Sequence, residues 1–246
     1  MPLSPDAIQR LERATLDAVA PAQVHTLGDW LLPSDPSTIG RATSAVHLHH
    51  EALDASAVAA IIQHYQGLGM PSKFRIADVP ALGLVQAALR AHGLNPTQPT
   101  LVQTGHLSDV LRLPAPHPVS VQPNPSELWG RVYTAAGFDP VDGAFRRAAL
   151  SRSPFVVYAH VHHEGGPLAA GTASLSQGWA SIHGMRTVPG ARGRGLASAI
   201  LVALARHALA QGMTDVFLQV EEDNHSAQSL YRRAGFTTAW RYHYWR

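Results

Sequence analysis

Apolar residues in the second half of the chain follow helical and strand spacing in turn. From Gly195 onward they recur at intervals of three and four, which predicts one long helix that ends at Gly212. Short apolar runs bounded by turn residues predict strands. The expected order is helices, three antiparallel strands, a long helix, a strand, a short helix and a last strand. The strands are expected at residues 155–163, 169–176, 179–187, 215–220 and 236–244, and the short helix at 227–234.

The first half shows a similar order of elements. A shift of 142 residues places Gly93 on Gly235 and the strand at 74–76 near 216–218. The pattern predicts an internal duplication, the alternative being chance similarity between two alternating segments. The elements expected here are helices at 5–19, 54–67 and 82–92 and strands near Val24 and Trp30 and at 45–49, 73–77 and 97–104.

A proline-rich stretch separates the two halves. Five prolines lie between Pro114 and Pro125, a density that excludes a continuous helix or a central strand. We therefore expect a first domain at 1–113, a linker at 114–118 and a second domain at 119–246. Residues 119–122 are expected to form a short strand after the linker.

Composition narrows the class of protein. The chain has 246 residues, of which 46% are hydrophobic and 15% charged, as in globular proteins. No apolar run reaches the roughly 18 to 20 residues of a membrane span, and the first residues lack the features of a signal peptide. With no Cys there is no disulfide, no Cys-ligated metal and no thiol nucleophile. We expect a cytoplasmic protein without membrane association.

The charge is distributed unevenly. The formal net charge of +2 argues against a nucleic-acid partner. Residues 1–125 hold 7 Lys and Arg against 9 Asp and Glu, whereas residues 126–246 hold 12 against 8. The second half is thus the better place for an anionic ligand, although biased base composition would also explain the many arginines.

A glycine-rich segment joins a predicted strand directly to the long helix. It reads Val-Pro-Gly-Ala-Arg-Gly-Arg-Gly-Leu-Ala over residues 188–197. Glycines let backbone N–H groups turn toward a ligand, and the start of a helix adds partial positive charge. This segment can therefore bind a diphosphate, although it has neither the nucleotide P-loop pattern nor GxGxxG.

Two motifs in the second half resemble the GCN5-related N-acetyltransferase family. Arg192, Gly195 and Ala197 match its signature [Q/R]-x-x-G-x-[G/A]. A second signature, N-x-x-A-x-x-L-Y-x-x-x-G-F, follows at the usual distance. It is matched by Asn224, Ala227, Leu230, Tyr231, Gly235 and Phe236. The resemblance covers about residues 119–246, and the first half resembles the degenerate companion domain of tandem members.

The resemblance implies a fold, a reaction and a set of site residues. The fold is α+β, with two tandem domains around a mixed sheet flanked by helices. The reaction is direct transfer of an acetyl group from acetyl-CoA to a primary amine of a small molecule or peptide. Tyr231 protonates the leaving thiolate. The residues expected to bind acetyl-CoA are Thr187, Val188, Arg192, Gly193, Arg194, Gly195, Leu196, Ala197, Asn224, Ala227 and Tyr231.

The sequence departs from the family pattern at the general base. Some members carry a Glu on the strand after the long helix, and Gln219 stands at that position. An amide cannot act as a general base. His183 is our first candidate, because the pKa of a free His lies near 6.5. Glu221 or Glu222, acting through water, is the alternative.

Other roles remain open for several of these residues. Asn224 stands where a helix N-cap is expected, Tyr231 lies on an apolar helix stripe, and Arg194 could simply be solvated. The histidines at 160, 162 and 163 do not complete a metal set, so no metal is expected. Acceptor contacts are expected from Trp129, Tyr133, Phe138, Tyr242 and Tyr244.

The first half lacks the cofactor motifs. At the same shift His50 falls on Arg192 and Leu89 falls on Tyr231, and residues 50–55 contain no glycine. We expect this half to form a wall of the acceptor site. The alternatives to an N-acetyltransferase are a non-catalytic acyl-CoA sensor and a tandem enzyme of mycothiol synthesis, and a homodimer is compatible with the sequence.

Overall fold

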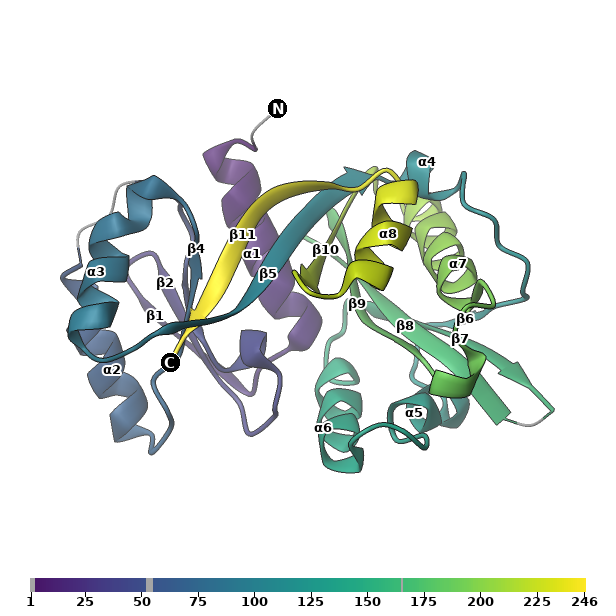
Figure 1. The fold of residues 1–246 in the computed structure, drawn as a ribbon, viewed down its shortest axis with the longest axis horizontal. Coiled ribbons are helices and arrows are strands. Elements are labelled where there is room, and N and C mark those ends of the chain that lie inside the picture. The colour runs from purple at the N-terminus through teal and green to yellow at the C-terminus, as the bar shows by residue number, and fades with distance from the viewer. Residues whose placement is uncertain (1–2, 52–54, 165) are drawn as a thin grey trace.

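The computed structural model describes residues 3–51, 55–164 and 166–246, which form one mixed sheet flanked by helices (Figure 1). In the described chain the strand order is β1-β2-β3-β4-β11-β5-β10-β9-β8-β7-β6. The strands are β1 Gln23–Leu27, β2 Trp30–Ser34, β3 Ala45–His47, β4 Phe74–Ala77, β5 Pro96–His106, β6 Ser120–Gln122, β7 Val156–His163, β8 Gly166–Ser176, β9 Trp179–Thr187, β10 Asp215–Glu221 and β11 Thr237–Trp245. The helices are α1 Pro5–Val19, α2 Ala57–Gly67, α3 Gly83–Ala91, α4 Leu107–Val110, α5 Glu127–Tyr133, α6 Pro140–Leu150, α7 Leu196–Ala210 and α8 His225–Arg233, with short 3-10 turns η1 Gly40–Ala42, η2 Pro80–Leu82 and η3 Pro189–Ala191.

The predicted α+β class and the predicted order of elements are confirmed. The first helix begins where its sequence directs: the Ser4 side chain accepts a hydrogen bond from the Ala7 amide, and proline fills the first position. Three local differences occur. The short helix α4 was not expected, β8 begins at Gly166 rather than at residue 169, and α2 begins at Ala57. The predicted helix start at 54 lies outside the described residues.

The two halves of the chain exchange their last strands. β5, from the first half, pairs with β10 from Asp215↔His106 to Glu221↔Thr100. β11, from the second half, pairs with β4 from Tyr242↔Ala77 to Trp245↔Phe74. β5 and β11 also pair with each other in the middle of the sheet. Figure 1 shows these two long strands crossing the centre of the molecule side by side.

The strand pairing has the symmetry that a duplication predicts. Each half contains a parallel pair, β3 with β4 and β9 with β10. Each half then has a last strand that pairs with the other half. The division into domains at 113 and 119 remains a prediction about the sequence, because strands from both sides of it share hydrogen bonds.

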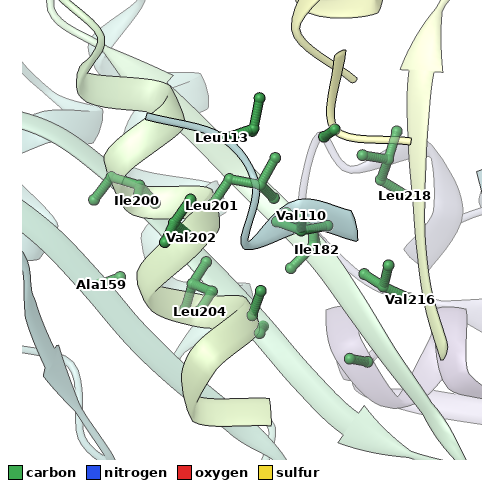
Figure 2. Packing of buried hydrophobic residues seen from close by; sticks show 14 of the residues in the cluster. Val110, Leu113, Ala159, Ile182, Ile200, Leu201, Val202, Leu204, Val216 and Leu218 are labelled. Atoms are coloured by element: carbon green, nitrogen blue, oxygen red, sulfur yellow. The ribbon is translucent and has the colours of Figure 1, made fainter. Parts of the chain in front are cut away.

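The larger core cluster lies between α7 and the strands β7 to β10. Figure 2 shows Ile200, Leu201 and Leu204 of α7 among Ile182, Val216 and Leu218 of β9 and β10. Val110 and Leu113, which follow β5, close the same cluster. The apolar helical spacing after Gly195 thus arises because that face is buried, at roughly 25 cal/mol for each Å² of apolar surface removed from water.

A second cluster lies on the other face of the central strands. Trp179 of β9 and Phe217 of β10 pack there with Leu11 and Ala14 of α1. Alternate residues of β9 and β10 therefore serve two cores, as the period of two in a strand requires. One helix of the first half is thus essential to the core beneath the strands of the second half.

The strands β9 and β10 separate at their carboxyl ends. Among the described residues their pairing runs from Val216↔Ala180 to Leu218↔Ile182, although both strands continue for at least three residues. Near the same place the pairing of β9 with β8 shifts around Gly184, which has φ 62°. The gap in the ladder opens the sheet between α7 and α8.

In the part of the chain that the structure describes, no helix is long and apolar enough to cross a membrane.

Candidate active site

A cavity of about 980 Å³ lies at the point where β9 and β10 separate. Its wall is built from both halves of the chain: η1 and β5 from the first, and β9, β10, α7, α8 and β11 from the second. The cavity brings together most of the residues that the sequence singled out. Those that line it are His183, Thr187, Arg192, Gly193, Gly195, Leu196, Ala197, Glu221, Asn224, Ala227 and Tyr231.

The glycine-rich turn has the geometry of an anion site. Gly193 and Gly195 have φ values of 75° and 78°, a region that L side chains rarely adopt. Among the described residues no acceptor bonds the backbone amides from Gly193 to Ser198. A Cβ at Gly193 would meet open space, whereas one at Gly195 would lie 3.3 Å from Pro116. The free amides at the start of α7 fit a diphosphate group.

The linker lies against this turn. The Ser198 hydroxyl donates to the Pro114 carbonyl at 2.5 Å, and His117 Nε2 lies 2.7 Å from the Arg194 carbonyl oxygen. Arg194 is exposed and Val188 packs in a separate apolar cluster, and neither lines the cavity. Their contact with a cofactor remains a prediction.

The helix α8 brings Asn224 and Tyr231 to the cavity. The Asn224 side chain accepts from the Ala227 amide at 3.2 Å, so Asn224 is the N-cap of this helix, the role that was left open. Tyr231 is 7% exposed, and its ring packs against that of Phe236 at a tilt of 59°. Burial raises the pKa of Tyr231 to about 12. Its hydroxyl bonds no other described residue, which leaves this proton for a bound ligand.

A polar network surrounds Gln219 on the side of the cavity away from α7. Its Oε1 accepts from Tyr242 Oη at 3.0 Å and from Arg41 Nη1 at 3.3 Å, while its Nε2 donates to Thr15 at 3.0 Å. The side chain is thereby fixed by groups of α1, η1 and β11. Tyr244 lies beside Tyr242, their hydroxyls 3.4 Å apart.

His183 is buried at the cavity wall. It is 3% exposed, and its Nε2 forms a short hydrogen bond with the Ser181 hydroxyl. Its Nδ1 has no partner among the described residues. Burial, with the nearby charge of Arg41, holds the pKa of His183 well below its ordinary value. The ring is therefore neutral at pH 7, and in the absence of a ligand it is a weaker base than a free histidine.

The other candidates for general base and acceptor contact lie in different surroundings. Glu221 is exposed and accepts a hydrogen bond from Gln98 at 2.8 Å. Tyr133, Phe138, Tyr242 and Tyr244 line the cavity. The expectation for Trp129 is wrong, since this side chain is fully buried against Tyr133 and Tyr158 and does not reach the cavity.

A carboxylate connects the two halves beside the cavity. Asp142 Oδ1 accepts from Thr38 at 2.7 Å, and its Oδ2 accepts from Arg146 and Arg186, each at 2.7 Å. Partial burial would raise the pKa of Asp142, but these hydrogen bonds outweigh it and lower the pKa to about 2. The Arg186 guanidinium also lies over the Phe138 ring. Arg146 and Arg186 thus share one carboxylate partner, which offsets one of their two charges.

The sequence reasoning missed six cations of the cavity, namely Arg146, Arg186, Arg233 and three that come from distant segments. Arg41, Lys73 and Arg246 line it, although they come from η1, the start of β4 and the end of β11. No motif surrounds any of them, and only the tertiary fold brings them together. Among the described residues, no cluster of three or more His, Asp or Glu side chains is placed to hold a metal.

The splayed strands, the glycine-rich turn at the start of α7 and the tyrosine of α8 define a GCN5-related acetyltransferase fold. Residues 6–245 match the family described as "Probable histone acetyltransferase Rv0428c C-terminal", and the chain belongs to this family of enzymes. The resemblance noted in the sequence is thereby confirmed.

Relatives and solved structures agree with this assignment. The chain is 23% identical over 244 residues to "Uncharacterized N-acetyltransferase YobR" of Bacillus subtilis (strain 168), covering 97% of this chain and 98% of that protein. A shorter match, 39% identical over 69 residues, covers 24% of this chain and 22% of a mycothiol acetyltransferase of Streptomyces avermitilis.

Two solved structures share the fold over the whole chain. A GCN5-related N-acetyltransferase from Kribbella flavida has a TM-score of 0.70 at 16% identity, covering 97% of this chain and 94% of that one. A tandem protein of the same class from the clavulanic acid biosynthesis pathway has a TM-score of 0.62 at 15% identity, covering 100% and 96%. The mixed sheet with flanking helices is therefore the fold of this class.

Proposed function

We propose that this acetyltransferase moves an acetyl group from acetyl-CoA to a primary amine of a small molecule or peptide. The observation that carries the proposal is the row of free backbone amides from Gly193 to Ser198, which opens into the same cavity as the Tyr231 hydroxyl. The amides suit a diphosphate and the hydroxyl suits a leaving thiolate. Acetyl-CoA carries both a diphosphate and a thioester that supplies the acetyl group.

The residues around the cavity would bind different parts of acetyl-CoA. At the α7 end, the amides of the glycine-rich turn bind phosphate oxygens, with Arg192 and Arg233 adding positive charge. Between β9 and β10, the missing ladder leaves room and unpaired backbone groups for an extended arm. Tyr231 lies between these ends, and its hydroxyl donates a hydrogen bond to the departing sulfur.

His183 is the proposed general base. The incoming amine must lose a proton, and His183 lines the cavity. Its buried, unpartnered Nδ1 can accept that proton in the tautomer in which Nε2–H donates to Ser181. Gln219 cannot take this role, and its amide instead fixes Tyr242 and Arg41 by hydrogen bonds. Glu221, which is solvated, is the alternative base through water.

The experiment has a binding arm and a transfer arm. Titration calorimetry should show one acetyl-CoA site per chain, and a panel of primary amines should release free CoA thiol in the presence of acetyl-CoA. Binding without thiol release from any amine would favour an acyl-CoA sensor. An absence of binding would overturn the assignment of the glycine-rich turn.

A further inference from the structure

The end of the cavity away from α7 holds cations without acidic partners. Arg41, Lys73 and Arg246 line it, and none of the ion pairs among the described residues involves them. The acid that lines the described cavity, Glu221, is exposed and bonded to Gln98. This excess of positive charge favours an anionic group at this end.

Arg41 is the cation nearest the proposed chemistry. Its Nη1 donates to Gln219 Oε1 at 3.3 Å, and its charge acts on His183 and Tyr242. Gln219 directly follows Leu218, the last residue of β10 that pairs with β9. An anion bound to Arg41 would therefore lie a short distance from the point where the strands separate.

The identity of residue 219 matters for this charge. A carboxylate at that position would stand within ion-pair distance of Arg41 and neutralise it. The neutral amide of Gln219 does not neutralise the guanidinium charge, but its hydrogen bond holds the Arg41 side chain in place. Gln219 thus accounts for two features: this position has no general-base Glu, and the charge of Arg41 has no acidic partner among the described residues.

Lys73 and Arg246 add to the same field. Lys73 Nζ donates to Thr43 at 3.2 Å and is half-buried. Burial, together with the charge of Arg246, lowers the pKa of Lys73. A lowered pKa is typical of a buried lysine without an acidic partner, and a negatively charged ligand bound nearby would raise the pKa of Lys73.

The phosphates of a CoA molecule do not account for these three cations. Phosphate groups are proposed at the start of α7, where Arg192 and Arg233 line the cavity. In Figure 1 α7 and the C-terminal end of β11, which Arg246 follows, lie on opposite sides of β10. The two cationic groups are therefore suited to different ligands.

We propose that the acceptor is a small amine that also carries a carboxylate, and that Arg41 binds this carboxylate, with Lys73 and Arg246 adding attraction. The inference rests on the proposed function and names its substrate class. The N–C bond forms as the C–S bond of the thioester breaks. The amine proton goes to His183, and CoA leaves as a thiolate that accepts a hydrogen bond from Tyr231. A strongly basic peptide is disfavoured, because like charges would meet at this end of the cavity.

The test compares amines that differ in one carboxylate. The pairs are L-phenylalanine with phenethylamine, L-lysine with cadaverine, and β-alanine with ethylamine, each assayed by release of CoA thiol. Wild type should favour the carboxylate in at least one pair. Arg41→Gln should raise the KM for that acceptor by about 10- to 100-fold, the range for losing a charged hydrogen bond, while the KM for acetyl-CoA stays unchanged.

Variants of the same kind separate specificity from packing. Arg41→Lys should recover part of the affinity, and Gln219→Glu should weaken the carboxylate acceptor by neutralising Arg41. Arg206→Gln, an exposed position of α7 outside the cavity, is the matched control and should change no KM. Equal use of both members of every pair, or better use of a basic peptide, would overturn the proposal and leave acetyl transfer standing.

A binding arm distinguishes failure of the inference from failure of the proposed function. N-Acetyl-L-phenylalanine and N-acetylphenethylamine are titrated against wild type and Arg41→Gln with CoA present. Suppose that no amine releases thiol, and that N-acetyl-L-phenylalanine binds to wild type alone while N-acetylphenethylamine does not bind. The anion site is then supported and the proposed transfer reaction is rejected. If the acid binds no better than its neutral partner, the anion site is rejected.

Discussion

Removal of the Tyr231 hydroxyl tests the acid role with little disturbance of the fold. Phe keeps the ring that packs against Phe236, and the hydroxyl bonds no other described residue, so Tyr231→Phe should leave the free energy of unfolding nearly unchanged. With the pKa of Tyr231 at about 12, full proton transfer to a thiolate whose conjugate acid has a pKa of about 8.5 is uphill by about 4.8 kcal/mol.

This difference predicts the size of the effect. A hydrogen bond from Tyr231 to the charged thiolate is worth about 1.5–3 kcal/mol, so kcat should fall by about 10- to 150-fold in Tyr231→Phe. The affinity for acetyl-CoA should change little. The assay is single-turnover release of CoA thiol, which reports the chemical step rather than product release.

Tyr158→Phe is the matched control. Its hydroxyl donates to the Leu150 carbonyl at 2.9 Å, away from the cavity. Its loss should cost about 0.5–1.5 kcal/mol of stability and leave kcat unchanged. A Tyr231→Phe enzyme with less than about a twofold loss of kcat in single turnover would refute the acid role. A loss above about a thousandfold would show complete proton transfer and refute the magnitude given above.

Three further predictions follow from other sites. Gly195→Val should raise the Kd for acetyl-CoA by about tenfold or more in calorimetry, whereas Gly212→Val, with a similar φ of 81° at the other end of α7 and open space around it, should not. Glu12→Gln should lower the free energy of unfolding in urea by about 3–5 kcal/mol, because it leaves Arg75, which lies 2.6 Å from Glu12, as a buried unpaired charge. The double variant Glu12→Leu/Arg75→Met should recover most of this loss. No recovery would contradict the ion-pair explanation. Stability should be full above about pH 6.5 and should fall as the pH drops through the lowered folded pKa values of four histidines, three of them buried and one half-buried. The slope is at most about 1.4 kcal/mol per pH unit for each, since the unfolded chain binds more protons, and a flat profile from about pH 7.5 to 5 would be the contrary result. These histidines are His47, His160, His183 and His243.

The elements of the fold and the α7 end of the cavity were predictable because their signals are local. Gly193 and Gly195 stand where the backbone needs positive φ, and Asn224 caps the helix that carries Tyr231. Each signal spans a few neighbouring residues, so spacing alone located it. Helix α1 was likewise predictable from its N-terminal Ser-Pro and its apolar stripe.

The other end of the cavity was not predictable, because distant segments form it. The position of the Arg41 side chain depends on a hydrogen bond to Gln219, which is 178 residues away in the chain. Of the five aromatic residues expected to contact the acceptor, Tyr133, Phe138, Tyr242 and Tyr244 line the cavity. Trp129 was expected there and is buried instead, since the register of a short helix against the sheet decides which side it presents.

The exchange of β5 and β11 has a consequence for biosynthesis. Strand β4 is the product of the first third of the chain, yet the neighbour that covers its inner edge is β11, made roughly 160 residues later. At about 5–20 residues per second, a ribosome leaves this edge open for about 10 to 30 seconds. An open strand edge is a template for wrong pairing, so the nascent first half should depend on chaperones more than its size suggests. For the same reason, cutting the gene at the proline-rich linker should give two aggregation-prone fragments rather than two domains.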